Sequence, residues 1–457
     1  MHPLVTPYAL IAMMLLFGIA GRSGLNRALV RVAAWLALLV VLWGIVFRTV
    51  GGDTRRYYAA FVEIRDLSFQ EMLANGPENI LFDSFLWLVG QIGTDIRLLT
   101  CSVVIFVILM LVYALRRILM PYETALMLFI YSAYPYLILY VASGLKTAIA
   151  LVFLLVGFTF LYKGRRLGWL LLFIAPFWHW GAWLVVPFVA LHLTVFNERV
   201  GYRRGLMIVL AALGVATALS ITGVNAALMS PLQNILDLSA RYDIYFMDAE
   251  HLNYHAGFRL DFTLFSLAPI FTLLYLKAAG CSLAMPRTTP VSPSPRPTVD
   301  QPLWDSSAPR SGRSNTPLNP SMLEPARPAL WRDDAAADDG HYAVPPSQPL
   351  PEGVSAQGLG RTALRGPDVA ADGRANLPGS FWWLSLYLSL NIIYQLFAFA
   401  PFADRFAAFS WFIMPIVIFL QFQEARSPQL VSQLIFSFVL GNILLLQFYT
   451  GNWIRLD

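Results

Sequence analysis

Apolar runs long enough to cross a bilayer constrain this chain more than any other feature. A helix needs about 20 mainly apolar residues to cross a hydrocarbon core of roughly 30 Å. Such runs recur along the 457 residues, of which 57% are hydrophobic and only 13% are charged. A soluble domain carries about 25% charged residues. Because a backbone within lipid must satisfy its hydrogen bonds internally, we predict an all-α, polytopic integral membrane protein.

The order of these runs and the positions of basic residues predict the topology. Arginines follow the first run at Arg22, Arg27 and Arg31, and basic residues mark cytoplasmic loops. We therefore expect both termini on the extracytoplasmic side, and we interpret the net charge of +5 as a sign of cytoplasmic loops rather than of nucleic-acid binding. We predict about 11–13 membrane helices, over residues 3–20, 32–47, 80–92, 98–115, 122–141, 147–162, 167–193, 205–221, 262–276, 381–400, 406–421 and 429–449.

Three segments differ from a simple span. Residues 54–79 have the pattern of an amphipathic helix on the outer surface. Residues 80–92 are short and contain Asp83 and Gln91, which predicts a re-entrant or interfacial segment. Residues 167–193 as one span would place the arginines that follow them outside. We therefore predict a short helical hairpin, folded at Trp178-His179-Trp180 with His179 near the outer surface.

Residues 280–379 have a different composition from the rest of the chain. They hold 17 of the 29 prolines and show no sustained apolar period. Such a composition cannot bury enough apolar surface to fold alone. We predict three parts: a membrane region over residues 1–279 with the main external loops, a Pro-rich disordered cytoplasmic insertion over 280–379, and C-terminal membrane helices over 380–457.

The chemistry is expected at the outer face, where polar residues from distant parts of the chain gather. The sequence has no Walker lysine loop, no zinc-ligand spacing, no glycine fingerprint and no nucleophile elbow. We expect converging basic groups to bind an anion such as a phosphate or pyrophosphate, with which arginine forms two hydrogen bonds. The polar residues expected near the outer face are Arg48, Asp53, Glu63, Glu78, Lys146, His179, Arg241, Arg259, Asp404 and Arg405.

Each of these residues also has a structural interpretation. Asp53 can cap the helix that follows it, and Arg48 can extend to lipid headgroups. His179 between two tryptophans can be a buried structural residue, and Arg405 can pair locally with Asp404. The residues alone do not decide between these roles.

Four pieces of sequence, in order and at the right rough spacing, resemble the EpsG family of bacterial membrane proteins. They extend over about residues 48–187. The pieces are Phe47-Arg48 through Gly51-Gly52-Asp53-Thr54 with Tyr57 or Tyr58 and Phe61; Tyr134-Pro135-Tyr136 followed by Ser143-Gly144-Leu145-Lys146-Thr147-Ala148-Ile149-Ala150; Lys163-Gly164-Arg165; and Phe177-Trp178-His179-Trp180-Gly181-Ala182.

The resemblance implies a Wzy-like polysaccharide polymerase of the bacterial inner membrane. Its substrates would be oligosaccharide repeat units linked to undecaprenyl pyrophosphate, which it would join into exopolysaccharide outside that membrane. Asp53, then His179, would be the catalytic base, and the residues that bind pyrophosphate and glycan would be Arg48, Tyr57, Lys146, Arg241, Arg259 and Arg405. The family more often has arginine followed by glutamine where this chain has Lys146-Thr147. Lysine keeps the positive charge but lacks the planar pair of N–H donors that a guanidinium presents.

We expect no cofactor, no metal and no nucleic acid. The expected partners are the lipid-linked oligosaccharide, membrane lipids and other polysaccharide export and chain-length proteins. Two alternatives stay open. One is a GT-C-type glycosyltransferase that uses a prenyl-phosphate sugar, for which Asp53 and Glu63 would bind a metal. The other is a transporter of a glycolipid, which should have interrupted helices with charges at mid-membrane.

The polymerase interpretation makes a first prediction about Arg48 and Asp53. In a strain lacking this protein and complemented with Arg48→Ala or Asp53→Ala at equal expression, single repeat units should accumulate on lipid and long glycan should be missing. Normal polymer from both variants would instead favour the headgroup anchor and the helix cap.

Overall fold

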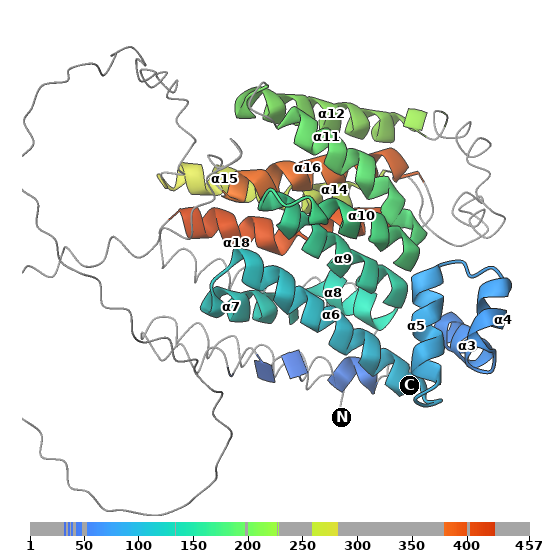
Figure 1. Ribbon diagram of the computed structural model, residues 1–457. Coiled ribbons are helices and arrows are strands. Elements are labelled where there is room, and N and C mark those ends of the chain that lie inside the picture. The colour runs from blue at the N-terminus through green and yellow to red at the C-terminus, as the bar shows by residue number, and fades with distance from the viewer. Residues whose placement is uncertain are drawn as a thin grey trace, which may run out of the picture. The chain divides into compact units, whose positions relative to one another are not determined.

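The computed structural model describes residues 32, 35–36, 38–39, 43–47, 53–132, 134–196, 200–225, 227, 258–281, 379–399 and 403–425. All regular structure in these residues is helical (Figure 1). The predicted segments at 3–20 and 429–449 lie outside them, as do residues 282–378 of the predicted insertion. The chain divides into two units, and the second, Thr288–Asp368, is also outside the described residues.

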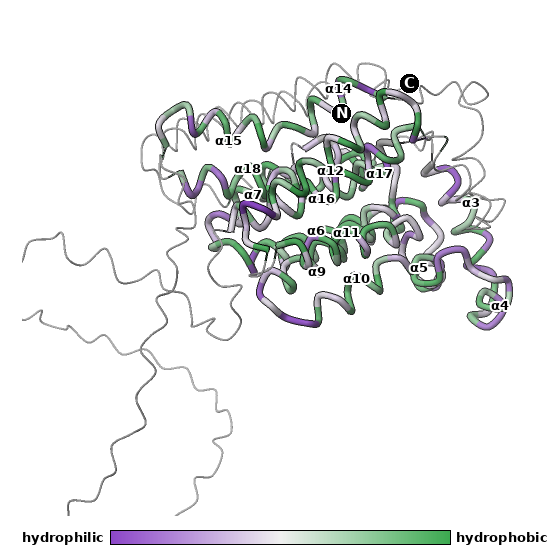
Figure 2. Tube along the Cα trace, turned by 90° about the horizontal axis from the view of Figure 1, so that it is seen from above, coloured by the Kyte–Doolittle hydropathy of each residue, from purple (hydrophilic) through white to green (hydrophobic). Residues whose placement is uncertain are grey.

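The described helices confirm an all-α polytopic membrane protein. Four segments are long and apolar enough to cross a membrane: α6 (Ile96–Ile118), α9 (Leu145–Tyr162), α12 (Tyr202–Thr222) and residues 405–424, which contain most of α17 (Ala403–Trp411) and all of α18 (Met414–Glu424). Two bent pairs raise the number to six, namely α7 (Pro121–Ser132) with α8 (Pro135–Ala142) and α14 (Leu260–Ser266) with α15 (Ala268–Ala278). Figure 2 shows hydrophobic residues along these helices and hydrophilic ones mainly near their ends.

Consecutive crossings alternate in direction, so helix ends gather at two ends of the bundle. At the first, which we call the His179 end, the Thr54 hydroxyl donates to the carbonyl of Ala142 over 3.0 Å and the Trp180 amide donates to Asn79 Oδ1 over 3.1 Å. At the second, the Glu424 end, the Ser380 amide donates to Glu424 Oε1 over 2.9 Å. The helix ends that meet at the second end carry Arg116, Arg117, Lys163, Arg165, Arg166, Arg203, Arg204 and Lys277.

Helix α5 (Ile80–Gly90) begins at the His179 end, where Asn79 precedes it. The last turn of α6 lies at the Glu424 end, where the Arg117 guanidinium stacks 3.7 Å from the centre of the Phe160 ring. With 23 residues, α6 is long enough that its first turn returns to the His179 end. The chain therefore enters and leaves α5 on the same side, as predicted for a re-entrant or interfacial segment.

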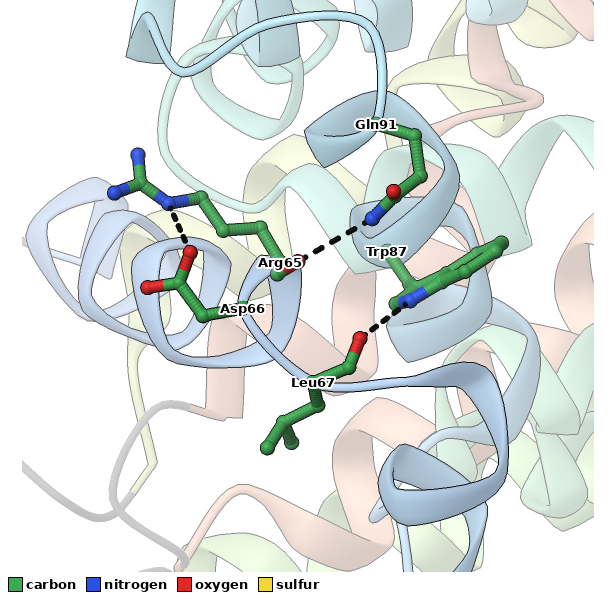
Figure 3. Close-up of polar contacts among 5 residues, drawn as sticks. All are labelled: Arg65, Asp66, Leu67, Trp87 and Gln91. Carbon is green, nitrogen blue, oxygen red and sulfur yellow. Dashed lines mark hydrogen bonds and ion pairs between the residues drawn. The ribbon is translucent and has the colours of Figure 1, made fainter.

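The predicted surface helix is two helices in the structure, α3 (Asp53–Arg65) and α4 (Phe69–Ala74). The division occurs because Ser68 starts a new helix with a capping box, in which its hydroxyl accepts from the Glu71 amide and the Glu71 carboxylate accepts from the Ser68 amide. Figure 3 shows the hydrogen bonds between the α5 region and the chain from the end of α3 to the start of α4. Trp87 Nε1 donates to the Leu67 carbonyl, and Gln91 Nε2 donates to the Arg65 carbonyl.

The predicted hairpin is also present. Helix α10 (Leu167–Trp178) leaves the Glu424 end, a 3₁₀ turn η1 (Trp180–Leu184) reaches Asn79, and α11 (Val185–Val195) returns. The return is fixed by His192, whose ring lies 5.2 Å from that of Trp382 near the start of α16 (Gly379–Phe397). The sequence-based interpretation of residues 167–193 as two short helices is therefore confirmed.

Interrupted helices in the bundle have their freed carbonyls satisfied by buried hydroxyls. At the turn between α17 and α18, the carbonyl of Trp411 accepts from Tyr134 over 2.7 Å and that of Phe412 accepts from Tyr131 over 2.6 Å. At the 51° bend between α14 and α15, the carbonyl of Ser266 accepts from Tyr387 over 2.8 Å. These bonds supply the donors that lipid cannot.

The close packing of α9 on α10 generates a stability prediction. A Cβ on Gly168 would lie 2.6 Å from the carbonyl oxygen of Gly157. We therefore expect Gly168→Ala to lower the free energy of unfolding by about 1–3 kcal/mol, because the two backbones must separate. Gly214→Ala in α12 is the matched control, since its Cβ would meet open space. Thermal unfolding in detergent should show a lower Tm for the first variant only, and equal Tm values would contradict the packing described.

Candidate functional site

Lys146 anchors the polar site at the His179 end. It lies in the first turn of α9, and its Nζ is 3.2 Å from Glu78 Oε1, in the segment that precedes α5. The Lys146 side chain is only 16% exposed and that of Glu78 32%. The ion pair is therefore partly shielded from solvent and joins two segments 68 residues apart.

His179 lies between α10 and η1, outside the segments that meet the criteria for crossing a membrane. Its side chain is 6% exposed, and within the described part of the chain its Nδ1 has no hydrogen-bond partner. The imidazole ring packs closely against Gly181, which has no side chain. A Cβ at this position would lie 3.3 Å from His179 Nε2 and 3.7 Å from Phe409 Cζ. The imidazole therefore lies where the hairpin tip meets α17.

The pKa of His179 reflects residues from three distant segments. Burial lowers the pKa of His179 to about 3, and the positive charges of Lys146 and Arg405 contribute to this shift. The ring is therefore neutral at pH 7 and has two cations near it. Lys146, His179 and Arg405 thus form one group, which we call the basic cluster.

Asn79 positions the hairpin tip and was missing from the predicted site. Its side-chain Oδ1 accepts a hydrogen bond from the backbone amide of Trp180, one residue after His179. The backbone amide of Asn79 donates to Asp83 Oδ2 over 3.2 Å. Asn79 and Glu78 follow a turn at Gly76 and precede the apolar residues of α5. Two polar residues just before an apolar run indicate the start of a helix. They do not predict that Asn79 contacts Trp180, which lies 101 residues away in the sequence.

The other predicted residues have different surroundings. Asp53 is the first residue of α3, and the buried Thr54 beside it bonds Ala142; the Asp53 side chain is outside what the structure describes. The Tyr57 ring packs edge-on against Phe82 at 5.5 Å. Arg48 and Arg241 lie outside the described residues.

Arg259 lies just before α14 and is paired within its own segment. Its Nη2 is 2.6 Å from Asp261 Oδ2, and its guanidinium stacks 3.7 Å from the centre of the Phe262 ring. The structure therefore groups Lys146, His179 and Arg405, and gives Arg259 a carboxylate partner of its own. Asp404, which the sequence offered as a partner of Arg405, has a side chain outside the described residues.

The basic cluster can bind an anion with two cations and one neutral imidazole. Guanidinium and ammonium groups provide strong charge-assisted hydrogen bonds to phosphate oxygens. The described residues contain no group of three or more His, Cys, Asp or Glu side chains that could hold a metal ion.

The low pKa of His179 predicts a pH-dependent stability. Its pKa is about 3 in the folded protein against 6.5 for an ordinary histidine, so between these values the unfolded chain binds a proton that the folded protein does not. The free energy of unfolding is therefore not reduced by this group above pH 6.5, and it falls as the pH decreases toward 3. The Tm of the native protein should thus fall relative to that of His179→Gln between pH 8 and pH 4.5. A difference in Tm that does not change with pH would contradict a buried neutral His179.

Comparison with known proteins identifies the family of this chain. No curated protein and no solved structure matches the chain significantly. The model of the EpsG family matches residues 32–280, which are more than half of the chain and include every described helix from α3 to α15. This range contains the re-entrant segment, the hairpin tip and two of the three residues of the basic cluster. The chain belongs to the EpsG family.

Proposed function

We propose that this protein polymerises oligosaccharide repeat units linked to undecaprenyl pyrophosphate, and that it acts as a glycosyltransferase at the outer face of the bacterial inner membrane. The family points to polysaccharide biosynthesis of this kind. In this proposal both termini lie outside the cytoplasm, and the Glu424 end, which is rich in basic residues, faces it.

The observation that carries the proposal is the convergence of Lys146, His179 and Arg405 at the end opposite the Glu424 end. Both cations are close enough to His179 to lower its pKa. A lipid pyrophosphate has its charge at the membrane surface and its prenyl chain in the hydrocarbon. A basic cluster at the end of an apolar bundle suits both parts of such a molecule.

The reaction forms a bond between an acceptor hydroxyl oxygen and the anomeric carbon of the donor glycan. The bond between that carbon and the pyrophosphate oxygen breaks, and the electron pair leaves with the pyrophosphate. Lys146 and Arg405 would stabilise this leaving group, together with Arg48, Arg241 and Arg259. The acceptor proton goes to a base, for which Asp53 and His179 are the candidates.

Substrate binding would itself prepare His179 for this role. A neutral ring with a pKa of about 3 is a weak base. A bound pyrophosphate would offset the charges of Lys146 and Arg405, which removes one cause of the low pKa. Glu78 would act as the counter-ion of Lys146 until the substrate displaces it.

A transporter is the second candidate, because the bundle contains interrupted helices, which are typical of transporters. The hydrogen bonds described at these interruptions join uncharged groups, such as tyrosine hydroxyls and backbone carbonyls. The basic cluster lies at the hairpin tip instead. This placement favours chemistry at the surface.

Lys146→Ala and Arg405→Ala test the proposal in a strain that lacks the native protein. Each should reduce long polymer about tenfold or more, with accumulation of single lipid-linked repeat units, because a group that stabilises the leaving pyrophosphate is lost. Lys277→Ala removes a cation at the opposite end, in the last turn of α15, and serves as the control. Polymer length can be read from gels at matched expression. Normal polymer from both site variants would contradict the proposed role of the basic cluster.

A further inference from the structure

Helices α14 and α16 face each other with uncharged polar side chains at the His179 end. Tyr387, Asn391 and Gln395 are spaced four residues apart and therefore lie on one face of α16. Opposite them lie Thr263 and Ser266 of α14. Gln395 Nε2 donates to Thr263 Oγ1 over 3.4 Å, Asn391 Nδ2 to the Ser266 carbonyl over 3.3 Å, and Tyr387 to the same carbonyl over 2.8 Å. We call these five residues the polar seam.

Two oxygens of the polar seam have no partner within the part of the chain that the structure describes. They are Asn391 Oδ1 and Gln395 Oε1, on side chains that are each 1% exposed. A buried acceptor without a donor is unfavourable, and such groups usually bind water or a ligand. Because both carboxamide NH₂ groups already donate within the seam, the ligand must supply hydrogen-bond donors.

The polar seam begins at the same end of the bundle as the proposed site. Gln395 lies in the last turn of α16, and Thr263 lies in the first turn of α14, the helix that Arg259 precedes. Asn391 and Ser266 lie about one turn further into the bundle. The seam is also tied to α17, the helix of Arg405, since Trp411 Nε1 donates to Ser266 Oγ over 2.7 Å.

We propose that the polar seam binds hydroxyl groups of a sugar in the lipid-linked repeat unit, with Asn391 Oδ1 and Gln395 Oε1 as the acceptors. This inference rests on the proposed polymerase function. A sugar ring suits the seam because it is uncharged and rich in O–H donors, and the hydrogen-bonded groups of the seam are uncharged too.

Entry of a sugar requires α14 to move away from α16. Helix α14 has only seven residues and ends at the 51° bend. Two of its three ties within the seam are bonds of 3.3 and 3.4 Å, which is longer than usual. These bonds can be exchanged for bonds to a ligand at little cost.

Asn391→Leu and Gln395→Leu test the inference because they remove the spare acceptors and leave the neighbouring groups satisfied. The Ser266 carbonyl keeps its bond from Tyr387, and Thr263 Oγ1 keeps its bond to the carbonyl of Arg259 over 2.9 Å. Ser389→Ala is the matched control, since Ser389 is buried on α16 but bonds Ser385 outside the seam.

The readouts are polymer produced from the strain's own lipid-linked repeat unit and the Tm of each purified variant. We expect both leucine variants to have a Tm equal to or above that of the native protein, while long polymer falls at least tenfold and single units accumulate. The control should retain polymer.

Two outcomes would overturn the inference. Normal polymer from both leucine variants would mean that the spare oxygens hold only water. A lower Tm in parallel with the loss of polymer would mean that Asn391 and Gln395 serve the fold. Lys146→Ala in the same strain separates the two proposals. If it abolishes polymer while the leucine variants do not, only the sugar-binding role fails; if the strain that lacks the native protein makes normal polymer by itself, the proposed function fails.

Discussion

A carbonyl freed by a break in a membrane helix has no water to bond, and the structure depends on how this constraint is met. The turn between α17 and α18 and the bend between α14 and α15 each leave such groups. Tyr131, Tyr134 and Tyr387 donate to them from other helices. Each unsatisfied group would cost about 1–3 kcal/mol or more, so the breaks and the tyrosines must be placed together. These bonds join α7 and the start of α8 to the end of α17, and they join α16 to α14.

The site follows from this arrangement. Because successive crossings alternate in direction, residues far apart in the chain meet at one end. Lys146 lies in the first turn of α9, His179 lies at the hairpin tip and Arg405 lies in the first turn of α17. The contacts of Glu78 with Lys146 and of Asn79 with Trp180 hold the re-entrant segment against them. The geometry of the site therefore depends on the packing of several helices rather than on one segment.

Much of the fold could be predicted from the sequence because lipid imposes simple rules. The length of an apolar run decides whether it can cross, and the arginines after residue 195 decided in favour of the hairpin at His179. The site was harder to predict. Asn391 and Gln395 lie in a run that reads as an ordinary span, and Asn79 has no periodic signal. Their roles depend on partners 101 to 132 residues away, which periodicity does not identify.

The central claim is that this chain alone joins lipid-linked repeat units, and reconstitution tests it most directly. Purified protein in liposomes would receive the lipid-linked repeat unit of its own organism, with no nucleotide sugar present. The account predicts glycans of two or more units and release of undecaprenyl pyrophosphate. Repeat units that stay single, or that only cross the bilayer, would contradict it and favour a transporter.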